Sequence, residues 1–454
     1  MDSRLKFASL AITAAFALAA CNLFGSSSPQ PRDDENSSPE RGEFRWLDSL
    51  EVASGNAYRG PWRMNESDFH YVDDPDVALA TDRTAVVWVD NERQDVFLQV
   101  FDDDQPLFDD PTNVSRSPNV FSWLPRVEFA DGGETVYVLW QEIAFTGGSH
   151  GGEILFARST DGGNTFDSPI NLSNTTAGAG KGRTSPERWH NGSLDLAIGA
   201  DGDIYTAWTE YEGPLRVSRS TDGGQSFDEP IHVAGDESDP TRAPSLATGP
   251  DETVYLAMTF GERRDADIYI ARSTDGGQSF DEPRRAVDTS AHSDSPSIAV
   301  DDDHTLHLAM ADSDRAQPQR YRVYYTRSTD RAESFEDLRE LSNIEGQSSS
   351  GANFPSLELD ADANPWVLWE HFPDYRHRPV GLKLTRSTDG GDSFESPFTV
   401  PGSTDSALGI SGGLQGLLMD KFAIGDDGRL AIAHSHFQEG QHSLIQLFLG
   451  EIHP

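Results

Sequence analysis

The chain has 454 residues, with 76 acidic and 35 basic side chains and a formal net charge of −41. That charge excludes a basic surface for nucleic acid and disfavours electrostatic attraction to an acidic membrane, because both need clustered lysine and arginine. The single cysteine excludes an intrachain disulfide framework and a cysteine-rich zinc site. With 24 Phe, 9 Trp and 11 Tyr, the chain has enough aromatic side chains for a folded core.

The N-terminal segment is typical of an export signal. Two basic residues, Arg4 and Lys6, precede the apolar run Leu10–Ala20, which is too short to span a bilayer. The run ends in Leu18-Ala-Ala-Cys21, which resembles the lipobox of bacterial lipoproteins. The resemblance implies cleavage before Cys21 and acylation of its thiol. Residues 1–20 are thus predicted to be a signal peptide, with ordinary signal cleavage beside an incidental cysteine as the alternative.

The next segment has the composition of a tether. Residues 22–42 are rich in Ser, Pro and acidic residues and cannot bury a core, so a lipidated cysteine and a disordered tether are predicted over 21–42. More than one acyl chain gives stable membrane anchoring. The expected location is therefore the bacterial cell envelope, after export across the inner membrane, with the outer membrane favoured as the site of the anchor.

An octet of the form Ser-x-Asp-x-Gly-x-x-aromatic recurs along the rest of the chain. Asp accepts hydrogen bonds from turn amides, Gly supplies a positive φ and the aromatic ring folds back, so the octet predicts a hairpin turn. The copies are Ser159–Phe166, Ser220–Phe227, Ser273–Phe280, Ser328–Phe335 and Ser387–Phe394. In the fourth copy Ala332 replaces the glycine, so we expect that turn to be strained or differently shaped.

The octets resemble the Asp-box of the bacterial sialidase-type β-propellers. The resemblance implies that the octet carboxylates are structural and that their turns lie on the outer face, opposite the ligand face. The carboxylates in question are Asp161, Asp222, Asp275, Asp330 and Asp389.

A two-strand unit accompanies the octets and is found seven times. The first strands begin near Pro75, Pro125, Ser193, Pro244, Pro296, Pro355 and Lys421. With a third strand before each octet and a fourth after it, the pattern predicts an all-β propeller of seven four-stranded blades over residues 43–454. The N-terminal segment Phe44–Val52 is expected to complete the last blade and leave no open edge. Six blades, the number in the known sialidases, is the alternative.

Alignment of the second strands brings out polar residues at their ends. Residues two apart in a strand share a face, so the position two beyond each Trp-type residue defines a ring. The ring is Asp90, Glu142, Glu210, Phe260, Asp312, His371 and His436. Such a ring at the channel mouth can hold a cation, an amine or sugar hydroxyls, or supply acid and base carboxylates. Strand-end capping and ion pairing with arginines is the structural alternative.

Arginines stand in the loops before the first strands. They are Arg59, Arg126, Arg188 and Arg242, with Trp189 and His190 beside Arg188. In sialidases three arginines clamp the carboxylate of an anionic sugar. Tyr58-Arg59-Gly-Pro61 is similar to the family's Tyr/Phe-Arg-Ile-Pro element without its Ile, which implies a ligand role for Arg59; a surface role beside Trp62 is the alternative. Arg93 lies where the family often has an acidic residue and an arginine.

The loop Glu370–Arg378 is the stretch richest in reactive groups. It carries Glu370, His371, Tyr375 and Arg376. Sialidases use a tyrosine nucleophile, and Tyr375 is the candidate here, although an extended surface insertion is an equal alternative. If the protein is an enzyme, the candidate catalytic residues are Asp90, Glu142, Glu210 and Tyr375.

Three functions are compatible with these features. The first is a lipid-anchored monomer that binds a glycan, a peptide or a partner protein on its channel face, and the second is an assembly scaffold for envelope proteins. The alternative is a sialidase-like exo-glycoside hydrolase that removes terminal sugars. No metal or cofactor is expected, because no HExxH, P-loop or GxSxG element is present. The acidic charge counts mildly against an anionic sugar.

Overall fold

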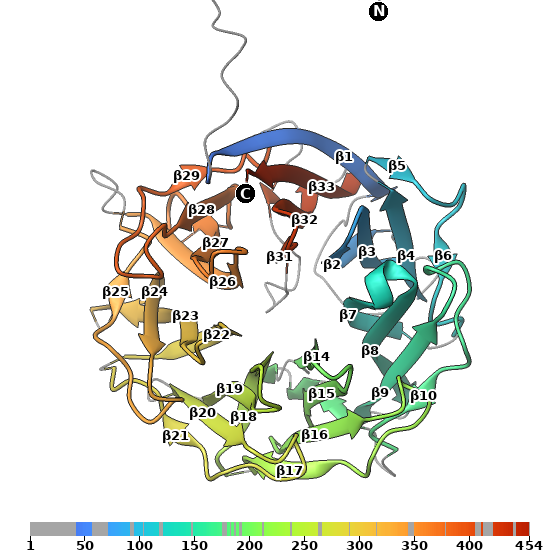
Figure 1. Ribbon diagram of the computed structural model, residues 1–454, viewed down its shortest axis with the longest axis horizontal. Coiled ribbons are helices and arrows are strands. Elements are labelled where there is room, and N and C mark those ends of the chain that lie inside the picture. The colour runs from blue at the N-terminus through green and yellow to red at the C-terminus, as the bar shows by residue number, and fades with distance from the viewer. Residues whose placement is uncertain are drawn as a thin grey trace, which may run out of the picture. The chain divides into compact units, whose positions relative to one another are not determined.

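Seven antiparallel sheets follow one another along the chain and stand around a central channel as the blades of a propeller (Figure 1). The computed structural model describes residues 42–56, 71–90, 95–102, 104–117, 121–146, 149–174, 179–181, 183–185, 188–189, 193–210, 213–236, 238–261, 266–289, 291–314, 316–343, 349–376, 378–404, 410–411, 421–438 and 442–453. The prediction of an all-β propeller with seven four-stranded blades is confirmed, and the six-bladed alternative is excluded. The predicted signal peptide, Cys21 and tether, as far as residue 41, lie outside the described residues.

The first three blades contain the following strands. Blade 1 has β2 (Val72–Ala80), β3 (Arg83–Asp90) and β4 (Asp95–Asp102), with β5 (Gln105–Pro106) and β6 (Thr112–Asn113) both paired to β4. Blade 2 has β7 (Phe121–Ala130), β8 (Thr135–Thr146), β9 (Ser149–Ser159) and β10 (Ile170–Asn171), and β11 (Ala179–Lys181) also pairs with β9. Blade 3 has β14 (Leu194–Ile198), β15 (Ile204–Thr209), β16 (Leu215–Ser220) and β17 (Ile231–Ala234). A separate pair, β12 (Arg183–Ser185) and β13 (Arg188–Trp189), precedes blade 3.

The remaining blades repeat this order. Blade 4 has β18 (Thr241–Thr248), β19 (Val254–Phe260), β20 (Asp267–Ser273) and β21 (Arg284–Arg285). Blade 5 has β22 (Ser293–Val300), β23 (Leu306–Asp314), β24 (Gln317–Ser328) and β25 (Arg339–Glu340). Blade 6 has β26 (Gly351–Leu359), β27 (Pro365–Phe372), β28 (Leu382–Arg386) and β29 (Phe398–Thr399). Blade 7 has β31 (Phe422–Ile424), β32 (Arg429–Gln438) and β33 (His442–Ile452), with β30 (Ile410–Ser411) also on β32.

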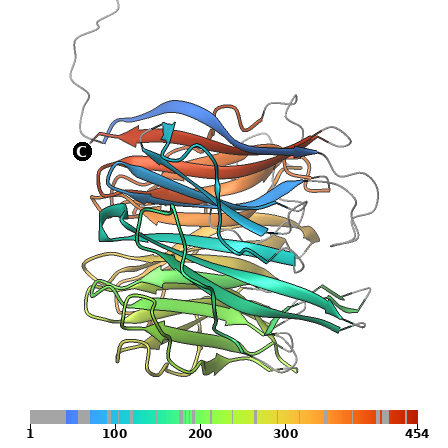
Figure 2. The same ribbon diagram turned by 90° about the vertical axis from the view of Figure 1, so that its right-hand side faces the viewer.

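The two ends of the propeller pair in blade 7. The strand β1 (Phe44–Asn56) runs antiparallel to β33, from Phe44 opposite Ile452 to Asn56 opposite His442. Figures 1 and 2 show β1 in blue alongside the red strands of the C-terminal end. The outer strand of blade 7 therefore comes from the N-terminal side of the propeller, and the ring closes without an unpaired edge at that point.

The core lies between the blades. Trp140 and Trp208 are completely buried, Trp369 is 1% exposed and Trp88 is 3% exposed, each within a cluster that joins two neighbouring blades. For example, Trp140 packs with Val87 and Leu98 of blade 1. Burial of such rings contributes favourably to each blade contact. In the part of the chain that the structure describes, no helix has the length and apolar character needed to cross a membrane.

The octets form turns between the third and fourth strands of blades 2 to 6. In the second copy, Gly224 N–H donates to Ser220 Oγ at 2.9 Å, and Ser226 donates to Asp222 through its N–H and its hydroxyl at 2.9 and 2.6 Å. These bonds lower the pKa of Asp222 to about 2. The ring of Phe227 then packs edge-on against Phe156 of the preceding blade, 4.7 Å between centroids. The octet is thus both a turn and an inter-blade contact.

The fourth octet keeps the same shape without its glycine. Arg331 and Ala332 adopt φ values of 62° and 66°, and Ala332 N–H still donates to Ser328 Oγ at 2.9 Å. Non-glycine residues at positive φ are strained by about 1 kcal/mol each. Of the two expectations for this copy, the structure shows strain and not a new shape.

The octet turns and the starts of the inner strands lie on opposite faces. Ser220 at the end of β16 pairs with Ile204 at the start of β15, whereas Leu215 pairs with Thr209 at the other end. We call the first side the octet face and the other side, where the inner strands begin, the mouth. Loops at the mouth are therefore free of the octet contacts.

A ring of seven arginines links every blade to the next on the octet face. Each donates a hydrogen bond to a backbone carbonyl of the following blade. The pairs are Arg83 to Gly133, Arg158 to Gly223, Arg219 to Gly276, Arg272 to Arg331, Arg327 to Gly390, Arg386 to Gly42, and Arg429 to Ala80. Five of these arginines directly precede the serine of an octet. The repeated motif is therefore Arg-Ser-x-Asp, and its arginine serves the neighbouring blade.

A buried histidine stands between blades 5 and 6. His307 is 1% exposed, and its Nδ1 lies 2.7 Å from the Tyr325 hydroxyl. Burial lowers the pKa of His307 to about 4, against the opposing pull of the Asp301 carboxylate. The folded protein therefore keeps this imidazole neutral well below the pH at which a free histidine gains its proton.

The arginine ring predicts a stability loss on truncation. Replacing Arg83 with Met leaves the buried carbonyl of Gly133 without its donor, which we expect to lower the free energy of unfolding by about 1–3 kcal/mol. Chemical denaturation measures the effect, and Arg83→Lys is expected to have a free energy of unfolding between those of the wild type and Arg83→Met. Arg284→Met, on the exposed strand β21, is the control and should change stability much less. Equal losses in Arg83→Met and the control would contradict the role of the ring.

The buried histidine predicts acid sensitivity. Between pH 6.5 and about 4 the unfolded chain binds a proton at His307 that the folded chain does not. The free energy of unfolding should therefore fall as the pH drops through this window, by about 3 kcal/mol for a difference of this size. Melting temperatures recorded from pH 7.5 to 4 test this against His307→Gln, which is expected to be less stable at pH 7.5 but to depend less on pH. Parallel pH profiles for the two proteins would refute the assignment.

Candidate ligand site at the channel mouth

The inner strand of five blades makes the same bulge before a proline. The residue before the proline has a φ between 50° and 57°, and the register with the second strand shifts there. The five residues are Asp74, Leu124, Ala243, Ser295 and Phe354. The bulge shifts each strand at its N-terminal end, where it meets the mouth. We call these five the bulge residues.

Hydrogen bonds from neighbouring blades hold this region. Ala243 N–H donates to Ser193 Oγ of blade 3 at 2.7 Å. Farther along the inner strands from the mouth, side chains that face the channel accept hydrogen bonds from backbone N–H groups of the next inner strand. These contacts are Asp76 with Val127 N–H at 2.8 Å, Asp195 with Leu246 N–H at 2.6 Å, Ser245 with Ile298 N–H at 3.1 Å and Ser297 with Leu357 N–H at 2.9 Å. The channel wall is therefore rigid, and the bulges are held in their strained conformation.

A hollow opens among the bulges of blades 4, 5 and 6. Its lining consists of Arg126, Asp195, Ala243, Pro244, Ser245, Ser295, Pro296, Ser297, Phe354, Pro355 and Ser356. We call it the mouth hollow.

Arg126 and Asp195 narrow the channel below the mouth hollow. Arg126 Nε lies 3.8 Å from Asp195 Oδ1, and both side chains are largely buried. The same two residues line a second hollow nearer the octet face, together with Glu128 and Glu358. The pair therefore borders both spaces, and we call it the floor of the mouth hollow.

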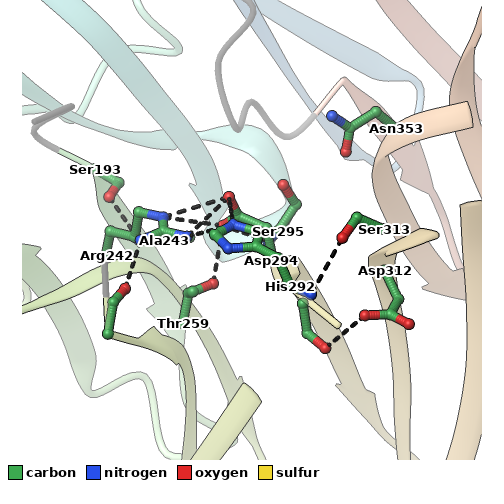
Figure 3. Close-up of polar contacts among 12 residues, drawn as sticks. Ser193, Arg242, Ala243, Thr259, His292, Asp294, Ser295, Asp312, Ser313 and Asn353 are labelled. Carbon is green, nitrogen blue, oxygen red and sulfur yellow. Dashed lines mark hydrogen bonds and ion pairs between the residues drawn. The ribbon is translucent and has the colours of Figure 1, made fainter. Parts of the chain in front are cut away.

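A charged cluster lies at the rim of the mouth hollow. Arg242 donates from Nε and Nη2 to Asp294 at 3.1–3.3 Å and from Nη1 to the carbonyl of Gly261 at 2.7 Å (Figure 3). Its Nη2 also lies 2.9 Å from His292 Nε2. Because a guanidinium can only donate, His292 Nε2 is the acceptor in this contact. We call Arg242, Asp294 and His292 the rim cluster.

The electrostatics of the rim cluster follow from its pairing. Burial alone would raise the pKa of the Asp294 carboxyl, but the Arg242 guanidinium outweighs it and holds this pKa well below its usual range. The Thr259 hydroxyl adds a hydrogen bond to Asp294 at 3.0 Å. The cluster therefore presents a fixed carboxylate and a fixed guanidinium whose charges largely cancel.

Tyr321 of β24 adjoins the rim cluster. Its ring meets the imidazole of His292 edge-on, with centroids 6.0 Å apart. Burial, with a smaller contribution from the Asp294 carboxylate, raises the pKa of Tyr321 to about 12. The phenol is therefore protonated at physiological pH and can act as a hydrogen-bond donor.

The ring predicted at the ends of the second strands does not edge the mouth hollow. Of its residues, none is among the described side chains that line the hollow. Asp90 is buried, His436 is completely buried against Phe448, and burial lowers the pKa of His371 to about 4. The second strand of each blade lies one strand behind the channel wall, which accounts for their absence from this lining.

Local partners hold the three remaining acidic ring residues, and the seventh member, Phe260, packs against Tyr269 of its own blade. Glu142 accepts from Ser117 Oγ at 2.6 Å, and Glu210 pairs with Arg216 of its own blade at 3.2 Å. Asp312 accepts from Ser293 Oγ at 3.0 Å, next to the rim cluster, and burial raises its pKa (Figure 3). These contacts match the structural alternative more closely than a continuous ligand ring, with Asp312 nearest to the site.

Two of the predicted arginines lie at the site and others cannot be placed. Arg126 is in the floor and Arg242 in the rim cluster, and each faces a carboxylate. Arg59, Arg93 and His190 lie outside the described residues. Arg188 and Trp189 contribute backbone to β13, and their side chains are not described. Neither of the two placed arginines thus offers an unopposed positive charge to an anionic sugar.

The described contacts of the loop after β27 are made with other parts of the fold and stabilise it. Glu370 forms a buried ion pair with Lys421, which joins blades 6 and 7. Tyr375 N–H donates to the carbonyl of Ser349 at 3.1 Å, and the guanidinium of Arg376 lies 5.9 Å from the Tyr375 ring. Arg376 also pairs with Asp374 at 2.5 Å. Tyr375 is not among the residues of the mouth hollow, so the structure brings no support for its catalytic role.

Several residues of the site were not found from the sequence. Asp294 and Asn353 occupy the position of Arg242, two residues before the proline of their blades, so an alignment on these prolines would have revealed them. The same alignment gives Phe354 as a bulge residue. Tyr321 had no such signal, because its place depends on the unusual length of β24.

Comparisons with known proteins agree with the fold. No family model matches the chain, and no curated protein matches it by sequence. An ulvan lyase from a family of polysaccharide lyases is similar in structure, with a TM-score of 0.57 and 13% identity over 89% of this chain and 96% of the other.

Two further solved structures give the same result. The polysaccharide lyase Uly1 has a TM-score of 0.56 and 10% identity, covering 90% of this chain and 100% of its own. An α-L-arabinanase of Penicillium chrysogenum, solved with arabinobiose, has a TM-score of 0.50 and 12% identity, covering 73% of this chain and 93% of its own. At these identities the likeness establishes the propeller fold alone.

Proposed function

We propose that the chain is an envelope-anchored propeller that binds a glycan in the mouth hollow. The observation that carries the proposal is the rim cluster, in which the Arg242 guanidinium is held by the Asp294 carboxylate, the carbonyl of Gly261 and the His292 imidazole. Neighbouring hydroxyls of a sugar need donors and acceptors at fixed separations, and a rigid carboxylate–guanidinium pair supplies both.

The charge balance of the site favours a neutral sugar. Arg242 is matched by Asp294 and Arg126 by Asp195, while the protein carries a formal charge of −41. An anionic sugar would meet no unopposed arginine among the described residues of the hollow. The solved neighbours are named as enzymes acting on polysaccharides, which supports a glycan over a peptide or a partner protein as the ligand.

Cleavage of terminal sugars is the second candidate function. Protonated Tyr321 and the carboxyl of Asp312, whose pKa is raised by burial, favour it, because both lie next to the rim cluster and can transfer a proton. The octets, with their likeness to the Asp-box, support the sialidase-like hydrolase as the form of this candidate.

The proposed function predicts binding that depends on the rim cluster. Isothermal titration with neutral, uronate-containing and sialylated oligosaccharides should reveal a neutral glycan that binds the wild type. Arg242→Met and Asp294→Asn are each expected to weaken that binding at least about tenfold, since each leaves a partner unpaired. Arg284→Met is the matched control and should bind as the wild type does. The proposal fails if no glycan binds, or if the rim variants bind unchanged while melting as the wild type does. Release of reducing ends from the bound glycan would favour the hydrolase.

The anchor proposal concerns Cys21. Its lipobox-like context supports lipid attachment and retention in the envelope, with residues 22–42 as the tether. In a bacterial host, the wild-type protein should fractionate with membranes and take up labelled fatty acid, whereas Cys21→Ser should do neither. Fatty-acid labelling that persists in Cys21→Ser would disprove attachment at this residue.

A further inference from the structure

Phe354 differs from the other bulge residues in its exposure. Asp74, Leu124, Ala243 and Ser295 are 2–3% exposed, so their side chains are buried in the wall of the channel. Phe354 is only partly buried, although it is the largest of the five, and it lines the mouth hollow. A large apolar side chain is therefore turned toward the space that a ligand would occupy.

The backbone at Phe354 is strained. Its φ is 55°, in the left-handed region that a bulky side chain rarely adopts, and the following Pro355 disfavours compact conformations at this position as well. The Phe354 N–H is held by Asn353 Oδ1 at 2.9 Å. Glycine or asparagine would adopt this conformation with less strain, so neither the turn nor core packing explains why the residue is phenylalanine.

The surroundings of the phenyl ring match the two kinds of surface that a sugar presents. A pyranose has polar hydroxyl edges and an apolar face of C–H groups. Phe354 lines the hollow together with Pro296 and Ser295, and the next residues back along the two strands are Asn353 and Asp294. Figure 3 shows Asp294 gathered with Arg242 and His292, and Asn353 standing apart from them on β26. An aromatic ring thus lines the hollow, and polar residues directly precede the bulge residues Ser295 and Phe354.

We propose that Phe354 is the platform on which a neutral pyranose ring stacks in the mouth hollow, while the rim cluster and Asn353 hold its hydroxyls. The proposal rests on the proposed function and narrows the ligand to sugars with a continuous C–H face. The negative face of an aromatic ring attracts the weakly positive C–H hydrogens of such a face. Sugars whose axial hydroxyls interrupt that face should bind more weakly.

The test compares side chains at position 354 with the neutral glycan that binds the wild type. Phe354→Tyr and Phe354→Trp should keep the affinity within about threefold, whereas Phe354→Ala and Phe354→Leu should lose about tenfold or more. Leucine is the critical control, because it keeps the apolar surface and removes the aromatic face. Arg242→Met is measured in parallel.

A second measurement separates a ligand role from a folding role. Phe354→Gly should melt no lower than the wild type, because it removes strain and little burial. Phe422→Ala, at a phenylalanine that is 1% exposed, should melt well below it. If Arg242→Met loses binding but all Phe354 variants bind normally, the platform is disproved and the proposed function stands. If the wild type binds no neutral glycan, both fail. A large drop in melting temperature for Phe354→Gly would make Phe354 a core residue and overturn the platform.

Discussion

Closure of the ring is the constraint on which this structure depends, and two belts of hydrogen bonds enforce it. On the octet face, seven arginines each reach a carbonyl of the next blade, so no blade is held by apolar contacts alone. In the channel, residues such as Asp76 and Ser245 accept from the following inner strand. Apolar packing between blades is not directional, and these polar contacts fix the register of each blade against its neighbour.

The same constraint decides where a ligand can bind. The octet face is occupied by turns whose Asp, Ser and Arg side chains already have partners, as in the second copy around Asp222. At the mouth, the inner strands bulge, and there the side chains vary from blade to blade, from Ala243 to Phe354. The repeated octet contacts close the ring, whereas the bulge residues differ between blades and can recognise a ligand. The candidate site is therefore placed among the bulges of blades 4 to 6.

The sequence predicted closure better than recognition. The octets and paired strand patterns gave the blade number, because the two-strand unit recurs seven times along the chain. The site depends on which strand lines the channel, and the alignment of second strands selected His436 and Asp90, which are buried one strand behind it. Had the repeating prolines been aligned, Arg242, Asp294 and Asn353 would have fallen on one position. Contacts such as that of His292 with Tyr321 join residues that are not at equivalent positions of the repeat, so aligning the repeats does not predict them.

The acidic residues behind the net charge of −41 are paired differently in the octets and at the mouth. In the octets the carboxylates are matched by turn N–H and hydroxyl groups, and their pKa values fall to about 2 at Asp222, Asp275, Asp330 and Asp389. In the mouth hollow and its rim, by contrast, each arginine faces a carboxylate. A site that neutralises its own cations inside a strongly acidic protein has little electrostatic energy to offer an anion. Selectivity there must come from hydrogen-bond geometry and from the exposed face of Phe354, which suits an uncharged sugar.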